Sequence, residues 1–125
     1  MDKKARLIKA LQARIENNRS IMSFNAKIFT QDFERFYKQY GKSHYEATIE
    51  NRIINELVVD LQTTKEEEII RLLQRYIEYF LQNLVEIRLY ENTTNLECNI
   101  SGMYTKEVYQ DLYKFYNNLL TDYRK

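Results

Sequence analysis

One uninterrupted stretch, residues 64–91, constrains the fold more than any other part of the chain. Thr64 and Glu67 have the spacing of a capping box, and three consecutive glutamates place negative charge at the positive end of a helix dipole. A helix of this length extends about 40 Å at 1.5 Å per residue, and its broad apolar arc predicts more than one neighbouring helix. Apolar residues recur at the spacing of a helical face, in one stripe of Ile69, Leu73, Tyr76, Phe80, Leu84 and Ile87 and a second of Ile70, Ile77, Leu81 and Val85.

The N-terminal half predicts three further helices. The first is amphipathic and covers residues 2 to about 17, and residues 18–29 are expected to form an irregular connection. A short helix then starts at Thr30 and stops at Gly41, since glycine commonly follows the last turn of a helix. A capping box at Ser43 and Glu46 opens the third helix, which ends near residue 62. The aromatic residues of the short helix share one helical face, which favours core packing over base stacking; they are Phe33, Phe36, Tyr37 and Tyr40.

The C-terminal half predicts the long central helix at about 65–91, a loop at 92–104 and a last helix at about 106–123, capped by Thr105. The chain has 125 residues, no proline and only two glycines, which suits long uninterrupted helices. We therefore predict an all-α fold, a five-helix bundle, in a single helical domain covering residues 1–125.

The last two predicted helices are apolar on more sides than a five-helix monomer can cover. Such faces, rich in tyrosine, are typical of surfaces that bind another protein. We expect these helices to serve both their own core and another subunit. The predicted subunit contact consists of Tyr109, Tyr113, Tyr116 and Leu120 on the last helix, followed by Tyr79, Asn83 and Tyr90 on the long helix.

The sequence offers no recognisable catalytic chemistry. Two glycines cannot build a phosphate-binding loop or a dinucleotide fingerprint. His44 is expected on the surface. One histidine and one cysteine, Cys98, do not supply enough ligands for a zinc site. The acidic run at 66–68 is explained by the start of a helix. We therefore expect no enzymatic activity, no metal and no cofactor.

Charge leaves one alternative function open. The net charge is +1, so no overall basic field indicates a nucleic-acid partner. A single cysteine favours a reducing compartment, and without an apolar leader or membrane-length run we expect a cytoplasmic protein that binds no membrane. The first helix nevertheless carries basic residues, and the alternative is a small helical nucleic-acid-binding protein that uses Lys3, Lys4, Arg6, Lys9 and Arg14.

Three segments and the order of the predicted helices resemble the helical A domain of the GINS replication complex, in the archaeal subunit type whose A domain comes first. The first helix, with Leu7, Leu11 and Glu16, resembles the family's opening segment. Residues 28–40 resemble its aromatic segment, although Glu34 stands where the family has tyrosine. Residues 83–90 are similar to the family's long-helix ending, but residues 91–92 are Glu-Asn where the family has Lys-Ile. The closing helix is similar in its placement.

The resemblance implies a non-catalytic scaffold subunit in DNA replication. Partner GINS subunits, or further copies of the chain, would assemble a tetramer that links the MCM helicase to a RecJ-like protein, with DNA contact left open and a nucleoid-associated location. Family members carry a β-rich B domain after the A domain, and this sequence, ending at Lys125, is expected to lack it. A stand-alone helical protein of mobile-element or CRISPR-complex origin is a third interpretation.

Overall fold

The computed structural model describes the backbone of residues 2–91 and 96–125 and the side chains of residues 2–86 and 105–125. The described backbone is helical apart from short joints and ends, which confirms the all-α prediction. Four long helices, rather than five, make up this part of the chain: α1 (Lys3–Gln31), α3 (Gly41–Thr63), α4 (Ile69–Glu91) and α5 (Leu96–Arg124). The short elements are α2 (Phe33–Arg35), the π-helix η1 (Phe36–Tyr40) and the 3-10 helix η2 (Glu66–Glu68).

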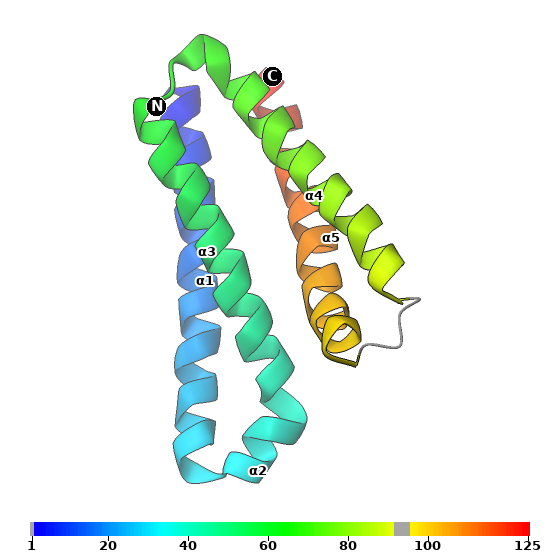
Figure 1. Cartoon of the computed structure of the whole chain (residues 1–125). Helices are drawn as coiled ribbons and strands as arrows, with labels where there is room; N and C mark the ends of the chain where they lie inside the picture. The colour runs from blue at the N-terminus through cyan, green and yellow to red at the C-terminus, as the bar shows by residue number, and fades with distance from the viewer. Residues whose placement is uncertain (1, 92–95) are drawn as a thin grey trace.

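The long helices form two hairpins, one from α1 and α3 and the other from α4 and α5 (Figure 1). Helix α5 joins the hairpins by packing on α3, whereas α4 packs chiefly on α5. The α1–α3 hairpin extends beyond the α4–α5 pair, and the two chain ends lie at the opposite end (Figure 1). The fold therefore has a four-helix body and a projecting two-helix tip.

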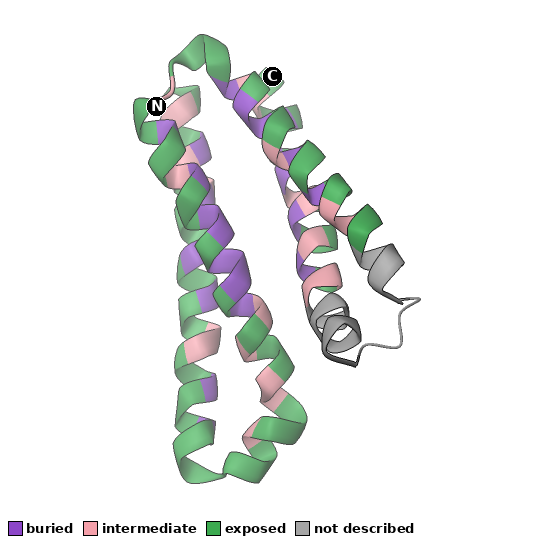
Figure 2. Ribbon diagram, viewed as in Figure 1, coloured by how far each residue is buried: buried purple, intermediate pink, exposed green. Residues whose placement is uncertain are grey.

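The hydrophobic core lies in the body, where the two hairpins meet. Buried residues line the facing sides of the helices there and become sparse toward the tip (Figure 2). The main apolar stripe predicted for the long helix is confirmed at its buried positions Ile69, Leu73 and Phe80. The stripe of the first helix is likewise buried, at Leu7, Leu11 and Ile15.

The irregular connection predicted at residues 18–29 is wrong, because α1 continues through this segment to Gln31. Asn18 and Asn25 interrupt the apolar pattern in the sequence, yet both are buried. The Asn18 amide donates to Asn51 Oδ1 at 2.9 Å, which satisfies a polar group inside the hairpin. Polar residues at interior positions thus concealed the helical period.

The turn after α1 also differs from the prediction. Gly41 does not end a helix: it has a φ of −59° and begins α3. The predicted capping box at Ser43 and Glu46 falls inside a helix that has already started, and Glu46 faces Lys42 at 3.7 Å. The predicted core packing of the aromatic residues at 33–40 is wrong for Phe33 and Tyr37, which are among the most exposed apolar side chains described, whereas Phe36 and Tyr40 are half-buried.

Two further predicted helix starts are wrong. The Thr64 hydroxyl donates to the Asp60 carbonyl at 2.6 Å, so it closes the end of α3 instead of capping the next helix. Helix α4 begins at Ile69, after η2, and ends at Glu91 as predicted. Helix α5 begins at Leu96, so that Thr105 lies inside it, and only residues 92–95 of the predicted loop fall outside the described residues.

Tyr116 is fully buried at the centre of the α4–α5 contact. Its ring meets Phe80 edge-on with the ring centroids 4.9 Å apart. Its hydroxyl is also buried and has no hydrogen-bond partner among the described residues. Burial raises the pKa of Tyr116 well above the ordinary tyrosine value of 10.0. A buried hydroxyl without a partner destabilises the fold.

We expect Tyr116→Phe to raise the free energy of unfolding by about 1 kcal/mol at neutral pH. Because the folded-state pKa lies above the unfolded one, the native protein also loses about 1.4 kcal/mol per pH unit above pH ~10 from this group, as the unfolded tyrosine ionises first. Urea titrations between pH 7 and 11 should show a shallower loss in the variant. Tyr37→Phe, at an exposed position, is the control and should change neither quantity. An unaltered pH slope in Tyr116→Phe would contradict the burial of this hydroxyl.

Candidate interaction surface at the hairpin tip

Six aromatic residues gather where the α1–α3 hairpin projects beyond the body, and we call this cluster the aromatic tip. Four of the rings are strongly exposed: Phe24 at 52%, Phe29 at 48%, Phe33 at 61% and Tyr37 at 75% of their surface. In Figure 2 most of the ribbon in this region has the colour of exposed residues. The complete aromatic tip consists of Phe24, Phe29, Phe33, Phe36, Tyr37 and Tyr40.

The rings of the aromatic tip pack against one another. Phe29 lies edge-on to Phe33 and Phe36, with centroid distances of 5.4 Å and 5.2 Å. Phe33 stacks on Tyr37 at 6.4 Å with an interplanar angle of 26°. Such offset and edge-to-face arrangements hold aromatic rings in preferred relative positions. The tip therefore presents an ordered apolar surface to the solvent.

The local backbone explains how this cluster forms at a turn. Helix α1 ends at Gln31, and Asp32 begins the next helix by accepting the Arg35 backbone N–H at 3.1 Å. The five residues Phe36–Tyr40 then form a π-helix that leads directly into α3. Because π-helical turns are rare and frequently occur at functional sites, this segment adds to the case for the tip as a site.

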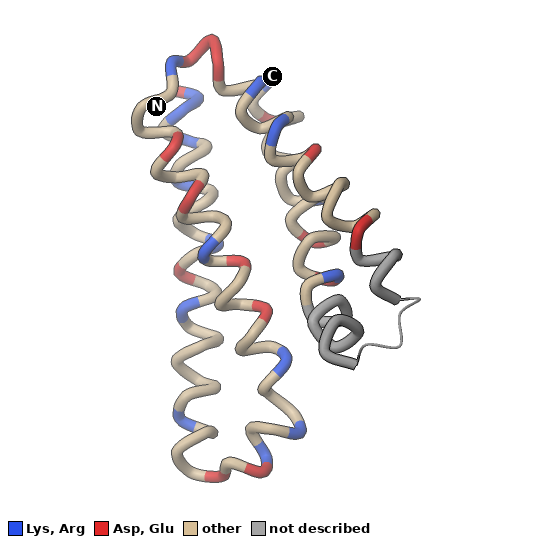
Figure 3. The backbone as a smooth tube through the Cα atoms, viewed as in Figure 1, with Lys and Arg blue, Asp and Glu red and all other residues tan. Residues whose placement is uncertain are grey.

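Charged residues of both signs surround the aromatic tip (Figure 3). Lys38 forms an ion pair with Glu34 at 2.7 Å. The Arg35 guanidinium lies 5.6 Å from the centre of the Tyr40 ring and donates to the Tyr40 hydroxyl at 3.4 Å. Two of the basic groups are thus engaged within the chain, and the tip carries no field of one sign.

A polar seam runs between α1 and α3 from the body toward the tip. Arg14 forms an ion pair with Glu50, and its guanidinium lies 4.8 Å from the centre of the Phe115 ring. Asn51 accepts from Asn18 at 2.9 Å and donates to the Ile15 carbonyl at 3.2 Å. Toward the tip, the buried Asn25 amide has no hydrogen-bond partner among the described residues. Buried polar side chains therefore lie between the two helices of the hairpin beside buried apolar ones such as Ile15 and Ile28.

The predicted subunit contact on α5 is largely internal. Tyr116 and Leu120 are buried in the core of the same chain, which is a correction to their prediction as an outer stripe. Tyr109 and Tyr113 are half-buried and pack against that core. The prediction assigned these faces to another subunit because it did not foresee that α4 and α3 both cover α5.

The predicted contact on the long helix is only partly open. Tyr79 is half-exposed, with its ring 6.2 Å from that of Tyr109. Burial raises the pKa of Tyr109 to about 12, and its hydrogen bond with Tyr79 acts in the same direction. The Asn83 amide donates to the Tyr79 carbonyl at 2.8 Å, and the side chain of Tyr90 lies outside the described residues. Among the described residues predicted for a subunit contact on α4, Tyr79 is the one with a large exposed ring.

The basic residues predicted for nucleic-acid contact do not form one open stripe. The Lys4 ammonium donates to the Thr64 carbonyl at 2.9 Å, and Lys3 lies 5.6 Å from the centre of the Tyr123 ring. Arg14 is held by its ion pair within the polar seam. Arg6 and Lys9 remain exposed. Three of the five cations are therefore engaged in contacts within the chain.

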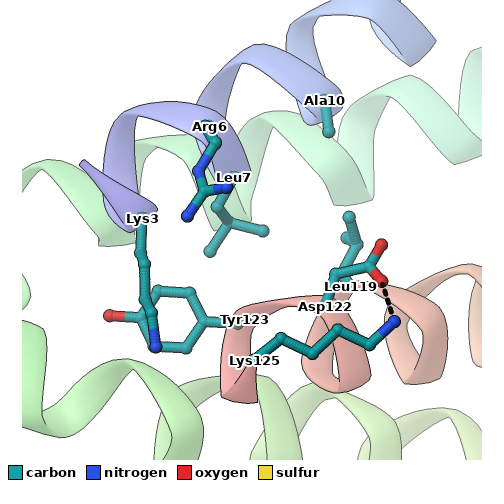
Figure 4. A pocket seen from close by; sticks show the side chains of 8 residues that line it. All are labelled: Lys3, Arg6, Leu7, Ala10, Leu119, Asp122, Tyr123 and Lys125. Carbon is teal, nitrogen blue, oxygen red and sulfur yellow. Dashed lines mark ion pairs between the residues drawn. The ribbon is translucent and has the colours of Figure 1, made fainter. Parts of the chain in front are cut away.

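A groove of about 430 Å³ lies at the opposite end of the molecule, between the start of α1 and the end of α5 (Figure 4). Its floor is apolar, from Leu7, Ala10 and Leu119. The rim includes Lys125, which faces Asp122 at 3.9 Å. Every charged residue of the lining is exposed, so no buried polar group is present to orient a ligand. The remaining lining residues are Lys3, Arg6 and Tyr123.

Other kinds of site have no basis in the described part of the chain. No three His, Cys, Asp or Glu side chains come together there as metal ligands. Within the same residues, no helix has the length and apolar character to cross a membrane. His44 is not the open surface residue that the sequence predicted: it is half-buried, with its ring 5.8 Å from that of Phe36. Cys98 lies outside the described side chains.

Comparisons of this chain with models of protein families, with curated proteins and with solved structures find no match. The resemblance to the GINS A domain therefore stays a prediction from the sequence.

Proposed function

We propose that this chain is a non-catalytic interaction module that binds a protein partner through the aromatic tip. The observation that carries the proposal is a cluster of exposed, mutually packed rings at the end of a hairpin that projects from the body. The largest exposed apolar patch on a soluble monomer covers about 300–600 Å² and often has a function. The body supplies the stable base from which the tip is presented.

The exposed ring surface has the size that a protein interface needs. At about 200 Å² per aromatic residue, the exposed fractions of Phe24, Phe29, Phe33 and Tyr37 leave roughly 450 Å² open. A standard interface buries about 800 Å² per partner, of which a little over half is apolar. At about 25 cal/mol per Å², burial of the tip would contribute roughly 11 kcal/mol before the costs of association.

The charges around the tip favour a protein over a nucleic acid or a membrane. A nucleic-acid site combines stacking rings with unpaired cations that neutralise phosphates. Here Lys38 is paired with Glu34, and Asp32 directly precedes Phe33 in the turn. Asp32 and Glu34 stand among the tip's cations, so the tip is not the basic patch that anionic lipid head groups attract. A protein surface can place opposite charges against both the acidic and the basic residues of the tip.

The proposal keeps the scaffold function that the GINS resemblance implies and moves the contact from α5 to the hairpin tip. A role in DNA replication, with the MCM helicase and a RecJ-like protein as partners, remains an expectation of that resemblance alone. A cytoplasmic location is likewise an expectation from the sequence.

A photo-reactive phenylalanine analogue in place of Tyr37 tests the proposal in cells of the source organism. We expect it to form covalent adducts with protein, because this ring is the most exposed of the tip. The same analogue in place of Val59, which is 61% exposed and lies near the end of α3 that is farther along the chain from the turn, is the matched control. Mass spectrometry identifies the adducts. Failure of position 37 to form protein adducts, or equal yields at both positions, refutes a protein-binding tip.

A further inference from the structure

We infer that the partner of the aromatic tip is a second copy of this chain, bound tip against tip in a two-fold symmetric dimer. The inference rests on the proposed function and specifies its partner. Most oligomers of soluble proteins are symmetric assemblies of identical chains, in which one surface patch contacts itself. Three observations on the tip support this occupant.

The first observation is that the buried residues of the described chain are dense in the body of the hairpin and sparse at its tip. In the body α5 lies on α3, and an ion pair between Lys42 and Glu107 at 2.9 Å joins α5 to the first turn of α3. The contacts that close the described part of the tip are those of α1 with α2, η1 and α3. A second hairpin packed alongside would restore a four-helix arrangement at the tip, with its rings inside.

The second observation is the distribution of charge. Asp32 and Glu34 lie in the same turn as Arg35 and Lys38, and Lys27 lies on the last turns of α1. A rim with both signs can face its own copy with opposite charges opposed, whereas a rim of one sign would repel it. The chain as a whole has a net charge of +1, so two copies approach without strong mutual repulsion.

The third observation is the area. A self-contact uses the same patch twice, so the four exposed rings of two copies would bury roughly 900 Å² of apolar surface. That value matches the apolar share of a standard interface of about 1,600 Å². The tip therefore provides the apolar area that a stable dimer needs without any contribution from the body.

Sedimentation equilibrium over a concentration series tests the inference. The full chain should approach twice its mass of 15.3 kDa. The double variant Phe33→Ser, Tyr37→Ser should raise the dimer dissociation constant at least about 30-fold, because central aromatic residues dominate interface energy. The control Val59→Ser removes an equally exposed apolar side chain away from the tip and should leave the dimer intact. Circular dichroism checks that each variant is folded.

Each other outcome overturns the inference. A full chain that stays monomeric up to about 1 mM, or a dimer that survives the double substitution, removes the self-contact. Adducts at position 37 with only a different protein refute the second copy but leave the proposed function standing. Flotation of the chain with anionic lipid vesicles that is lost in the double variant would assign the tip to a membrane and refute both.

Discussion

Phe80→Ala is expected to lower the free energy of unfolding by about 3–5 kcal/mol, the usual cost of removing a fully buried aromatic ring. Phe80 has no exposed surface. Its ring centroid lies 4.9 Å from that of Tyr116 and 6.0 Å from that of Tyr109, both on α5. Because α4 packs chiefly on α5, the loss of this ring weakens the main attachment of α4 to the molecule.

Guanidinium unfolding of Phe80→Ala beside Leu81→Ala measures this effect. Leu81 is adjacent in the sequence but 44% exposed, so its truncation should cost less than about 1 kcal/mol. The comparison separates burial from helix propensity, since both variants place alanine in the same turn of α4. Equal costs for the two substitutions would mean that α4 does not lie on α5 by this face.

The α4–α5 contact also explains why the sequence suggested another subunit. Eleven tyrosines is a high number for a chain of 125 residues, and tyrosine is common at protein interfaces. In the structure Tyr76, Tyr109 and Tyr116 lie around Phe80 within one chain. The Tyr76 hydroxyl keeps a polar partner by donating to Asp60 at 2.7 Å. Periodicity identified the apolar faces but not which helix covers them.

The fold class and the inner face of α4 could be predicted because apolar spacing is a local property. Helix boundaries could not, where the deciding contact is distant in the sequence. Asn18 is buried because Asn51, on another helix, bonds to it. Thr64 and Glu67 match a capping box, but the Thr64 hydroxyl bonds back to Asp60 at the end of α3. A local pattern cannot distinguish these alternatives.

The aromatic tip shows the same limit for the candidate site. Phe33, Phe36, Tyr37 and Tyr40 have the spacing of a buried helical face, and the sequence therefore favoured the core. The same spacing also fits a helical face that is exposed in the monomer and becomes buried when a partner binds. The rings of the tip are exposed because α1 extends to Gln31, which places the turn beyond the α4–α5 pair. The structure exposes rings at the tip, whereas Tyr116 and Leu120 of α5 are buried.

The polar seam that supports the tip leads to the last prediction. Asn51→Leu should lower the free energy of unfolding by about 2 kcal/mol, because it leaves the buried Asn18 amide without its acceptor. The double variant Asn18→Leu, Asn51→Leu should cost less than either single change, since replacing both partners with apolar side chains leaves neither amide unpaired. Urea unfolding of the four proteins of this double-mutant cycle measures the coupling.

If the two single costs simply add, the Asn18–Asn51 hydrogen bond contributes nothing specific. We expect strong coupling between the two substitutions instead. We also expect a change in the position of the tip, which unfolding measurements do not detect. Buried polar pairs can fix the register of two helices, which apolar contacts specify weakly. The double variant should therefore remain folded while the tip loses its fixed position relative to the body. Cross-linking at position 37 should then fall although the tip residues are unchanged, and an undiminished yield would show that the polar seam does not position the tip.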